Sequence, residues 1–222
     1  MVTLYGSLRS RTLRPLWLLR EMDAPFEWVP VVQAYRIGDP SAASAPVNTA
    51  SAAFRALNPM AQVPAMTDGE LTLTESMAIT LYLARKFGGP LTPQTEVEEA
   101  LTLQWAFFGD STIEQPALDI LIVNHRGTVD TEQGRATIDA ARKALQQPFA
   151  RLDAHLQSRP WLLGDRFTVA DILLVECVRF AMYDTVAFAE FAALRRWLEA
   201  CRARPVFTQL WAERTAEPDR YA

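Results

Sequence analysis

Hydrophobic positions in the first 90 residues change repeatedly between strand-like alternation and helix-like spacing. Phe26 and Trp28 alternate with polar residues, whereas Leu13, Leu16 and Trp17 recur at the spacing of one helix face. The pattern predicts strands at 1–5, 26–32, 63–67 and 70–73, and helices at 13–23, 51–57 and 75–87. The segments therefore follow the order β-α-β-α-β-β-α, as expected for an α/β domain over residues 1–87.

The second half of the chain shows helical spacing without a convincing strand. A Gly- and Pro-containing linker is predicted at residues 88–94, and an all-α domain at 95–222. Helices are predicted at 95–124, 133–157, 168–183, 190–203 and 206–214. Gly109-Asp110 and Pro116 suggest a bend within the first of these helices.

A helix-capping pattern opens the third of these helices. Thr168 is a preferred N-cap residue, and Asp171 at the N3 position can accept a hydrogen bond from the N–H of the cap. Phe167 and Ile172 stand where a hydrophobic staple forms. We therefore interpret Asp171 as a folding residue and not as a catalytic one.

Composition narrows the class of protein. Half of the 222 residues are hydrophobic and the net charge is −4, which allows a sizeable core and argues weakly against nucleic-acid binding. No apolar run is as long as a membrane span, and no signal peptide is expected before the first strand. Cys177 and Cys201 form no disulfide or metal pattern, and the two histidines are isolated. We expect a cytoplasmic protein without a metal site.

One segment has the features of a peptide-binding site. Val63-Pro64 lies at the start of a predicted strand, and Glu75-Ser76 opens a helix. A strand backbone can pair with an extended peptide, and a helix start offers free N–H groups to a carboxylate. Glu75 could meet an ammonium group, and Ser76 could bind the carboxylate. A γ-glutamyl tripeptide such as glutathione carries both groups.

These residues resemble the glutathione site of the cytosolic glutathione transferases. The pattern N-P-x-x-x-V-P spans residues 58–64, and a hairpin then leads to E-S at residues 75–76. G-D-x-F-T-x-A-D at residues 164–171 is typical of the C-terminal domain of that family. The resemblance covers essentially the whole chain and implies a thioredoxin-like first domain, glutathione as co-substrate and a homodimer.

The resemblance also assigns roles to individual residues. It implies that Pro64 is cis and that Val63 pairs with the cysteinyl backbone of glutathione. Gln62, Glu75 and Ser76 complete the expected glutathione-binding set. The Ala-, Ser- and Pro-rich loop at 33–50 is longer than is usual in the family, and we expect it to cover part of the site.

A transferase must favour the thiolate of glutathione, since the thiolate is the nucleophile. A hydroxyl near a helix start does so by hydrogen bonding and by the helix dipole. Pro15 lacks an N–H, so the first helix should begin no earlier than about residue 12. Ser10 is the first candidate, because it lies just before that start; Thr12, alternatively a plain N-cap, is the second, and Ser7, alternatively a turn residue, is the third.

Other side chains near this turn can be interpreted in two ways. Arg9, Arg11 and Arg14 could raise the local potential, or could form a solvated basic face. The spacing of Tyr5, Ser10 and Arg14 resembles that of the serine-type transferases, in which case Tyr5 serves in packing. The turn contains no cysteine, which argues against the thiol-reducing branches of the family.

Trp105 and Phe108 share a helix face and are predicted to line the pocket for a hydrophobic electrophile, although such a pair can equally belong to a core. The leading function is glutathione conjugation. A non-catalytic glutathione-binding protein of the same fold is an alternative. Glutathione-dependent peroxidase or disulfide chemistry is another.

Overall fold

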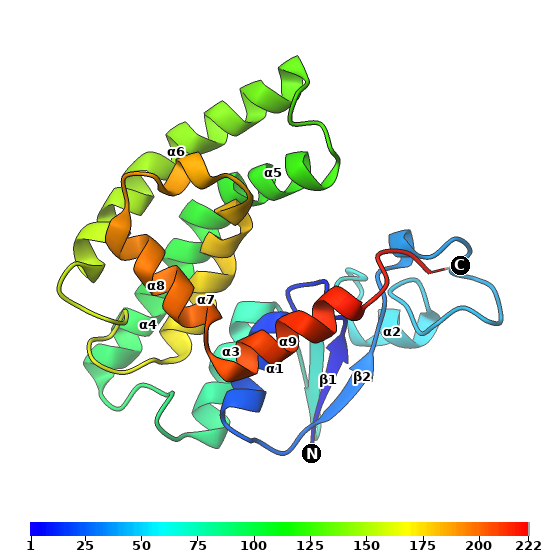
Figure 1. Ribbon diagram of the computed structural model, residues 1–222. Helices are drawn as coiled ribbons and strands as arrows, with labels where there is room; N and C mark the ends of the chain where they lie inside the picture. The colour runs from blue at the N-terminus through cyan, green and yellow to red at the C-terminus, as the bar shows by residue number, and fades with distance from the viewer. Residues whose placement is uncertain (222) are drawn as a thin grey trace. The chain divides into compact units, whose positions relative to one another are not determined.

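The computed structural model describes residues 1–221 and divides the chain into two compact units (Figure 1). Unit 1 contains Met1–Gly89 and the segment that starts at Pro205, and unit 2 contains Pro90–Arg204. The first division falls within the predicted linker at 88–94. No helix among the described residues is long and apolar enough to cross a membrane.

A four-stranded mixed sheet forms the centre of unit 1. Its spatial order is β2-β1-β3-β4; β1 is parallel to β2 and antiparallel to β3, and β3 and β4 form a hairpin. The elements are β1 (Val2–Gly6), α1 (Leu13–Glu21), β2 (Glu27–Pro30), the short 3-10 helix η1 (Ala34–Arg36), α2 (Ala52–Leu57), β3 (Ala65–Asp68), β4 (Leu71–Thr74) and α3 (Ser76–Phe87). This order confirms the predicted thioredoxin-like first half.

The two faces of β1 serve different layers of the core. Val2 and Leu4 are buried on one face of the strand, as the alternation of a strand requires. Tyr5 points to the other face, where it packs against the cluster of Val31, Phe54 and Ala65. The interpretation of Tyr5 as a packing residue is therefore confirmed.

The last helix, α9 (Pro205–Ala216), also belongs to unit 1. Phe207 of α9 lies against Trp17 of α1, with 4.7 Å between the ring centroids, and Arg20 binds Glu213 through two hydrogen bonds of 2.7 and 2.9 Å. Figure 1 shows α9 running alongside α1. The sequence pattern assigned residues 205–222 to the all-α domain, whereas α9 packs in unit 1. The difference arises because helical spacing does not reveal which core a helix covers.

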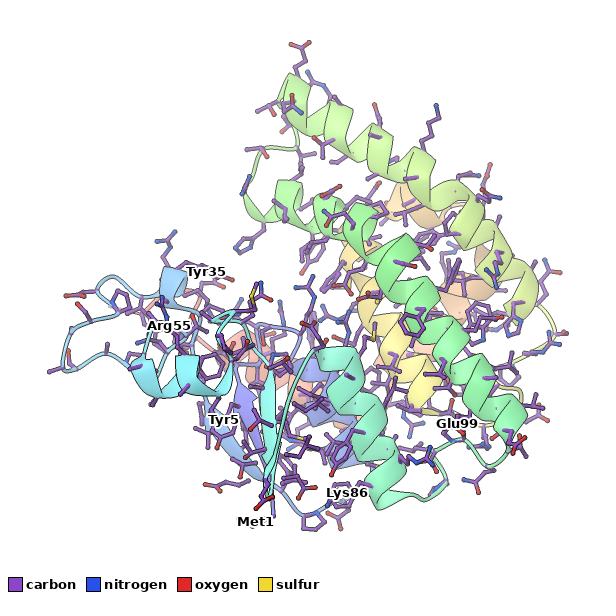
Figure 2. All side chains as sticks on the ribbon, turned by 180° about the vertical axis from the view of Figure 1, so that it is seen from behind. Met1, Tyr5, Tyr35, Arg55, Lys86 and Glu99 are labelled. Carbon is purple, nitrogen blue, oxygen red and sulfur yellow. The ribbon has the colours of Figure 1, made fainter. Side chains whose placement is uncertain are left out.

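Ion pairs and a hydrogen bond to Asp68 connect several segments at one end of the unit 1 sheet. Asp68, at the end of β3, accepts a hydrogen bond of 2.7 Å from the Tyr82 hydroxyl and pairs with Lys86 at 2.5 Å. The N-terminal amine of Met1 is 3.9 Å from the same carboxylate group. Figure 2 shows Met1 and Lys86 at the same end of unit 1, away from Tyr35.

The regular elements of unit 2 are all helices within the residues that the structure describes. Its elements are α4 (Glu96–Phe108), the π-helical turn η2 (Gly109–Ile113), α5 (Glu114–His125), α6 (Glu132–Leu156), α7 (Val169–Val178), the 3-10 helices η3 (Arg179–Tyr183) and η4 (Thr185–Phe188), and α8 (Ala192–Arg202). Every residue of α7 is buried, as expected for a mostly apolar helix at the centre of unit 2.

The predicted bend in the first helix of unit 2 is the π-helical turn η2 between α4 and α5. A Cβ atom on Gly109 would lie only 3.0 Å from Leu174 Cδ1 and 3.1 Å from Cys177 Sγ. A glycine at this position therefore lets the turn approach α7 closely without displacing these two side chains.

The start of α7 confirms the predicted capping box. The Thr168 N–H donates to Asp171 Oδ2 at 2.9 Å, and the Thr168 hydroxyl lies 3.2 Å from the same oxygen. Asp171 Oδ1 accepts from the Leu162 N–H at 3.0 Å and from Trp197 Nε1 at 2.8 Å. Burial raises the pKa of Asp171, and these donors oppose that shift. The residue therefore serves the fold, as the sequence indicated.

Candidate functional site

The register of the sheet brings three loop segments to one end of unit 1. Ala65 at the start of β3 pairs with Tyr5 near the end of β1, and with Thr74 at the end of β4. The turn at 7–12, the Val63-Pro64 pair and the Glu75-Ser76 pair are attached at these points. Helices α1 and α3 also begin here, so the positive ends of both helix dipoles lie at this end of the sheet. At α1 the first N–H groups, of Leu13 and Arg14, donate to the Ser10 and Arg11 carbonyls.

Ser10 lies in the turn between β1 and α1 and is only partly buried. Its Oγ donates to the Ser7 carbonyl oxygen at 2.7 Å and accepts the Thr12 N–H at 3.1 Å. The hydroxyls of Ser10 and Thr12 are 2.7 Å apart. Helix α1 begins at Leu13, which agrees with the limit inferred from Pro15. The Ser10 hydroxyl thus lies immediately before a helix start.

Thr12, the second candidate, is fully buried. It occupies the N-cap position, but its side chain makes no capping hydrogen bond. A Cβ atom on Gly6 would lie 2.0 Å from Thr12 Oγ1, and Gly6 has a φ of 154°. Glycine is therefore required where the threonine packs on the end of β1. The position of Thr12 suits support of Ser10 better than contact with a ligand.

Ser7, the third candidate, is also buried. Its hydroxyl donates to Gln33 Oε1 at 3.0 Å, and Arg36 Nη1 lies 3.4 Å from the same hydroxyl. The side chain therefore belongs to a network beneath the turn.

The peptide bond between Val63 and Pro64 is cis, which confirms the expectation from the resemblance. Among the described residues, no hydrogen bond reaches the backbone N–H or C=O of Val63. Both groups can therefore pair with an extended peptide. Gln62, the adjacent expected contact, has an exposed side chain.

Asn58 shapes the turn that precedes this pair. It is buried, and its Nδ2 donates to the Gln62 carbonyl at 2.7 Å while its Oδ1 accepts the Met60 N–H at 3.1 Å. Ala61 within the turn has a positive φ of 54°. The N-P pattern was visible in the sequence, but the role of Asn58 in holding the turn was not.

Glu75 and Ser76 lie at the start of α3 with opposite exposure. Glu75 is exposed and has a φ of 68°, a strained conformation for a residue with a Cβ and one that is common at functional sites. Ser76 is buried, and its Oγ accepts a hydrogen bond of 2.8 Å from Arg14 Nη1. Because this bond uses the oxygen as acceptor, the Ser76 proton is available to a ligand carboxylate.

The three arginines near the turn differ sharply in burial and in their partners. Arg14 is 1% exposed and joins α1 to the start of α3 through Ser76. Arg11 is exposed, and Arg9 binds the C-terminal segment of unit 1. Arg14 is therefore the arginine that brings positive charge to the expected carboxylate site.

Trp105 and Phe108 lie on α4 of unit 2. Trp105 is 2% exposed and contacts Phe108 edge to face at 5.7 Å and the ring of His155 at 4.8 Å. The Arg151 guanidinium lies 5.3 Å from the Trp105 ring centre and 4.5 Å from that of Phe108. These contacts favour the core interpretation for Trp105. A contact of Phe108 with an electrophile stays a prediction.

Comparisons with known proteins agree with this arrangement. The profile of the glutathione S-transferase N-terminal domain matches residues 1–85, and that of the C-terminal domain matches residues 96–205. The glutathione S-transferase GstB of Escherichia coli is 30% identical over 92% of this chain and 95% of its own. The disulfide-bond oxidoreductase YfcG of the same species is 32% identical over 70% of this chain and 74% of its own.

A solved structure shows the same fold with the ligand present. It is the theta class glutathione S-transferase from Xanthomonas axonopodis pv. citri with glutathione bound. It covers 94% of this chain and 95% of its own length, with a TM-score of 0.72 and 30% identity. The chain belongs to the glutathione S-transferase family.

Proposed function

We propose that this chain is a glutathione transferase that uses Ser10 to hold the glutathione thiolate for attack on an apolar electrophile. The observation that carries the proposal is the partly exposed Ser10 hydroxyl directly before α1. Its end of the sheet also carries Val63, whose backbone N–H and C=O make no hydrogen bond among the described residues.

Each segment of the site has a distinct task in binding. The Val63 backbone pairs with the cysteinyl residue, and Gln62 lies beside it. Glu75 meets the γ-glutamyl ammonium, and Ser76, supported by Arg14, donates to the carboxylate. The start of α3 adds further N–H donors to that carboxylate. Together these contacts fix the tripeptide so that its sulfur faces Ser10.

The chemical step needs a thiolate and an oriented electrophile. Ser10 has one proton, which in this structure points to the Ser7 carbonyl or to the Thr12 hydroxyl. When that proton is donated to sulfur, the Thr12 N–H still supports the Ser10 oxygen. The hydrogen bond and the α1 dipole both favour the charged sulfur. The sulfur then forms a bond to the electrophile, and the leaving group departs with the electron pair.

The test compares Ser10→Ala with Thr12→Ser. Ser10→Ala should keep glutathione binding within about 3-fold but lower the rate of conjugation by about 100-fold, because one donor to the developing charge is lost. Ultraviolet difference absorbance should show a weaker thiolate band at neutral pH. Thr12→Ser keeps the buried hydroxyl and should change neither measurement by more than about 3-fold.

A thiolate band that survives in Ser10→Ala would assign activation to another group. Saturable binding by the unaltered chain without any thiolate band would instead favour a non-catalytic glutathione-binding protein.

Glutathione-dependent disulfide chemistry is a second candidate, favoured by the likeness to YfcG. The thiolate would attack one sulfur of a disulfide and release the other as a thiolate; a second glutathione would then release glutathione disulfide. Cys177 and Cys201 are buried, so the sulfur would have to come from glutathione. The product separates the candidates, since conjugation yields a thioether and this reaction yields glutathione disulfide.

We further propose a cytoplasmic homodimer, as in the family. Two apolar residues of α4 support the dimer. Leu103 and Phe107 lie one turn apart and are 40% and 68% exposed, so a second chain could cover them.

A further inference from the structure

The end of α9 and the residues after it form the C-terminal tail, defined here as residues 215–221, which contacts the turn that carries Ser10. Glu217 Oε2 accepts the Leu8 N–H at 2.8 Å. Arg9 Nε donates to the Glu217 carbonyl at 2.8 Å, and Arg9 Nη2 donates to the Thr215 carbonyl at 3.2 Å. Arg9 also forms an ion pair with Asp219. Leu8 and Arg9, the two residues directly before Ser10, are thus both bound by the C-terminal tail.

A second, buried arginine, Arg36 of η1, also binds the C-terminal tail. The Arg36 side chain is 7% exposed, and its Nη1 pairs with Glu217 Oε1 at 2.8 Å. Arg36 Nε donates to the Asp219 carbonyl at 3.2 Å, and the Tyr221 N–H donates to the Arg36 carbonyl at 2.8 Å. A buried guanidinium that loses its carboxylate partner is strongly destabilising. Glu217 is therefore the counter-charge on which this contact depends.

The same arginine reaches the turn through a short network. Arg36 Nη1 donates to Gln33 Oε1 at 2.8 Å, and the Ser7 hydroxyl donates to the same oxygen at 3.0 Å. Gln33 Nε2 donates to the Arg9 carbonyl at 3.1 Å. The Ser7 carbonyl in turn accepts the Ser10 hydroxyl at 2.7 Å. The position of Ser10 is thus connected to Glu217 through the turn backbone and through Arg36.

We propose that Glu217 and Arg36 are positioning residues for the thiol-activating turn, so that the C-terminal tail is a working part of the glutathione site. The proposal rests on the proposed function of Ser10. Neither residue touches the reacting atoms; both act by holding Leu8, Arg9 and Ser7. Removing the tail contact leaves the peptide-binding segments in place and frees the turn that aims the hydroxyl.

The test replaces Glu217 and follows binding and thiolate formation separately. Glu217→Ala should lower kcat for conjugation by about 10-fold or more, because small displacements of an activating group are costly. It should raise the pKa of the bound thiol, seen as a thiolate band that appears at higher pH. Glutathione affinity should change by less than about 3-fold, since no hydrogen bond or ion pair joins Val63, Glu75 or Ser76 to the tail among the described residues.

Two further variants separate positioning from stability. Glu213→Ala is the matched control, because it removes the ion pair of α9 with Arg20 and leaves the turn untouched; it should not move the thiol pKa. The double variant Glu217→Ala with Arg36→Met removes the unpaired buried charge. It should recover the melting temperature lost in Glu217→Ala but not the thiolate band, because the Leu8 N–H still lacks its acceptor.

The outcomes distinguish this proposal from the function on which it rests. If the unaltered chain forms no thiolate, the proposed function fails, and this proposal fails with it. If the unaltered chain forms thiolate and Glu217→Ala does so equally, only the role of the tail is overturned. An equal loss in Glu213→Ala would also overturn it, since general anchoring of α9 would then explain the effect.

Discussion

At the scale of single residues, the two glycines with a positive φ at the ends of strands carry different constraints. Gly6 faces Thr12 so closely that an added Cβ would lie 2.0 Å from its hydroxyl. Gly69, in the hairpin, has a φ of 61° and no heavy atom within 4 Å of such a Cβ. The conformational cost of alanine applies to both positions, but crowding applies only to Gly6.

We therefore expect Gly6→Ala to destabilise the chain more than Gly69→Ala does. Overpacking of this kind costs about 1–3 kcal/mol beyond the backbone effect. Urea denaturation of the two variants measures the difference. Because Thr12 supports Ser10, Gly6→Ala should also weaken the thiolate band, whereas Gly69→Ala should leave it unchanged. Equal stabilities would show that Thr12 can move aside without cost.

The residue scale also marks the limit of prediction from sequence. Ser10 could be ranked above Thr12 because Pro15 limits the helix start, and the cis bond at Pro64 followed from the family pattern. The link from Arg14 to Ser76 joins residues far apart in the chain, and no periodicity reports such a contact. The same holds for Asn58, whose side chain acts on the backbone of its own turn.

At the scale of elements, α7 depends on polar contacts at its first turn. Asp171 accepts four donors, from Thr168 twice, Leu162 and Trp197. Asp171→Ala should cost about 3 kcal/mol or more, because several buried donors lose their acceptor together. Asp165→Ala, at an exposed position in the loop before α7, is the matched control and should cost less than about 0.5 kcal/mol.

Thermal or urea unfolding of these two variants measures how much each substitution lowers the free energy of unfolding. A loss in Asp171→Ala no greater than that in Asp165→Ala would mean that water replaces the carboxylate without penalty. The capping box could be predicted from the sequence because Thr168 and Asp171 are only three residues apart. The two extra donors lie outside α7, Leu162 in the preceding loop and Trp197 on α8, and only the folded chain brings them to Asp171.

The spacing of hydrophobic residues predicted where helices begin and end better than it predicted which helices pack together. Helix α9 was predicted at nearly its observed length, yet its core partner is α1 of unit 1. The single helix predicted at 95–124 is instead α4 and α5 joined by a π-helical turn. Gly109 allows that turn to approach Cys177, which is a packing reason and not a local one.

At the scale of the whole molecule, Asp68 should contribute to the acid stability of the chain. Hydrogen bonds from Lys86 and from Tyr82 lower the pKa of Asp68 below its usual value. A carboxyl whose pKa is lowered by folding stabilises the folded state fully above its unfolded pKa of about 3.9. The contribution is lost as the pH falls through the lowered pKa of the folded state.

Asp68→Asn should therefore reduce the free energy of unfolding at pH 6, and the difference from the unaltered chain should shrink between about pH 4 and pH 2. Urea denaturation across this range measures it, with Glu70→Gln in the exposed hairpin as the control. A difference that stays constant as the pH falls would show that the lost stability comes from packing and not from the charge of Asp68.

The contact of Glu217 with Leu8 has a consequence for how the chain is made. A ribosome adds about 5–20 residues per second, and domains usually fold in the order in which they emerge. Unit 1 departs from that order, because the acceptor for the Leu8 N–H is translated only after all of unit 2. Its strands can pair early, but the turn that holds Ser10 receives this support only after unit 2 has been translated. Unit 1 is therefore completed only after unit 2 has been made, although most of unit 1 precedes it in the chain.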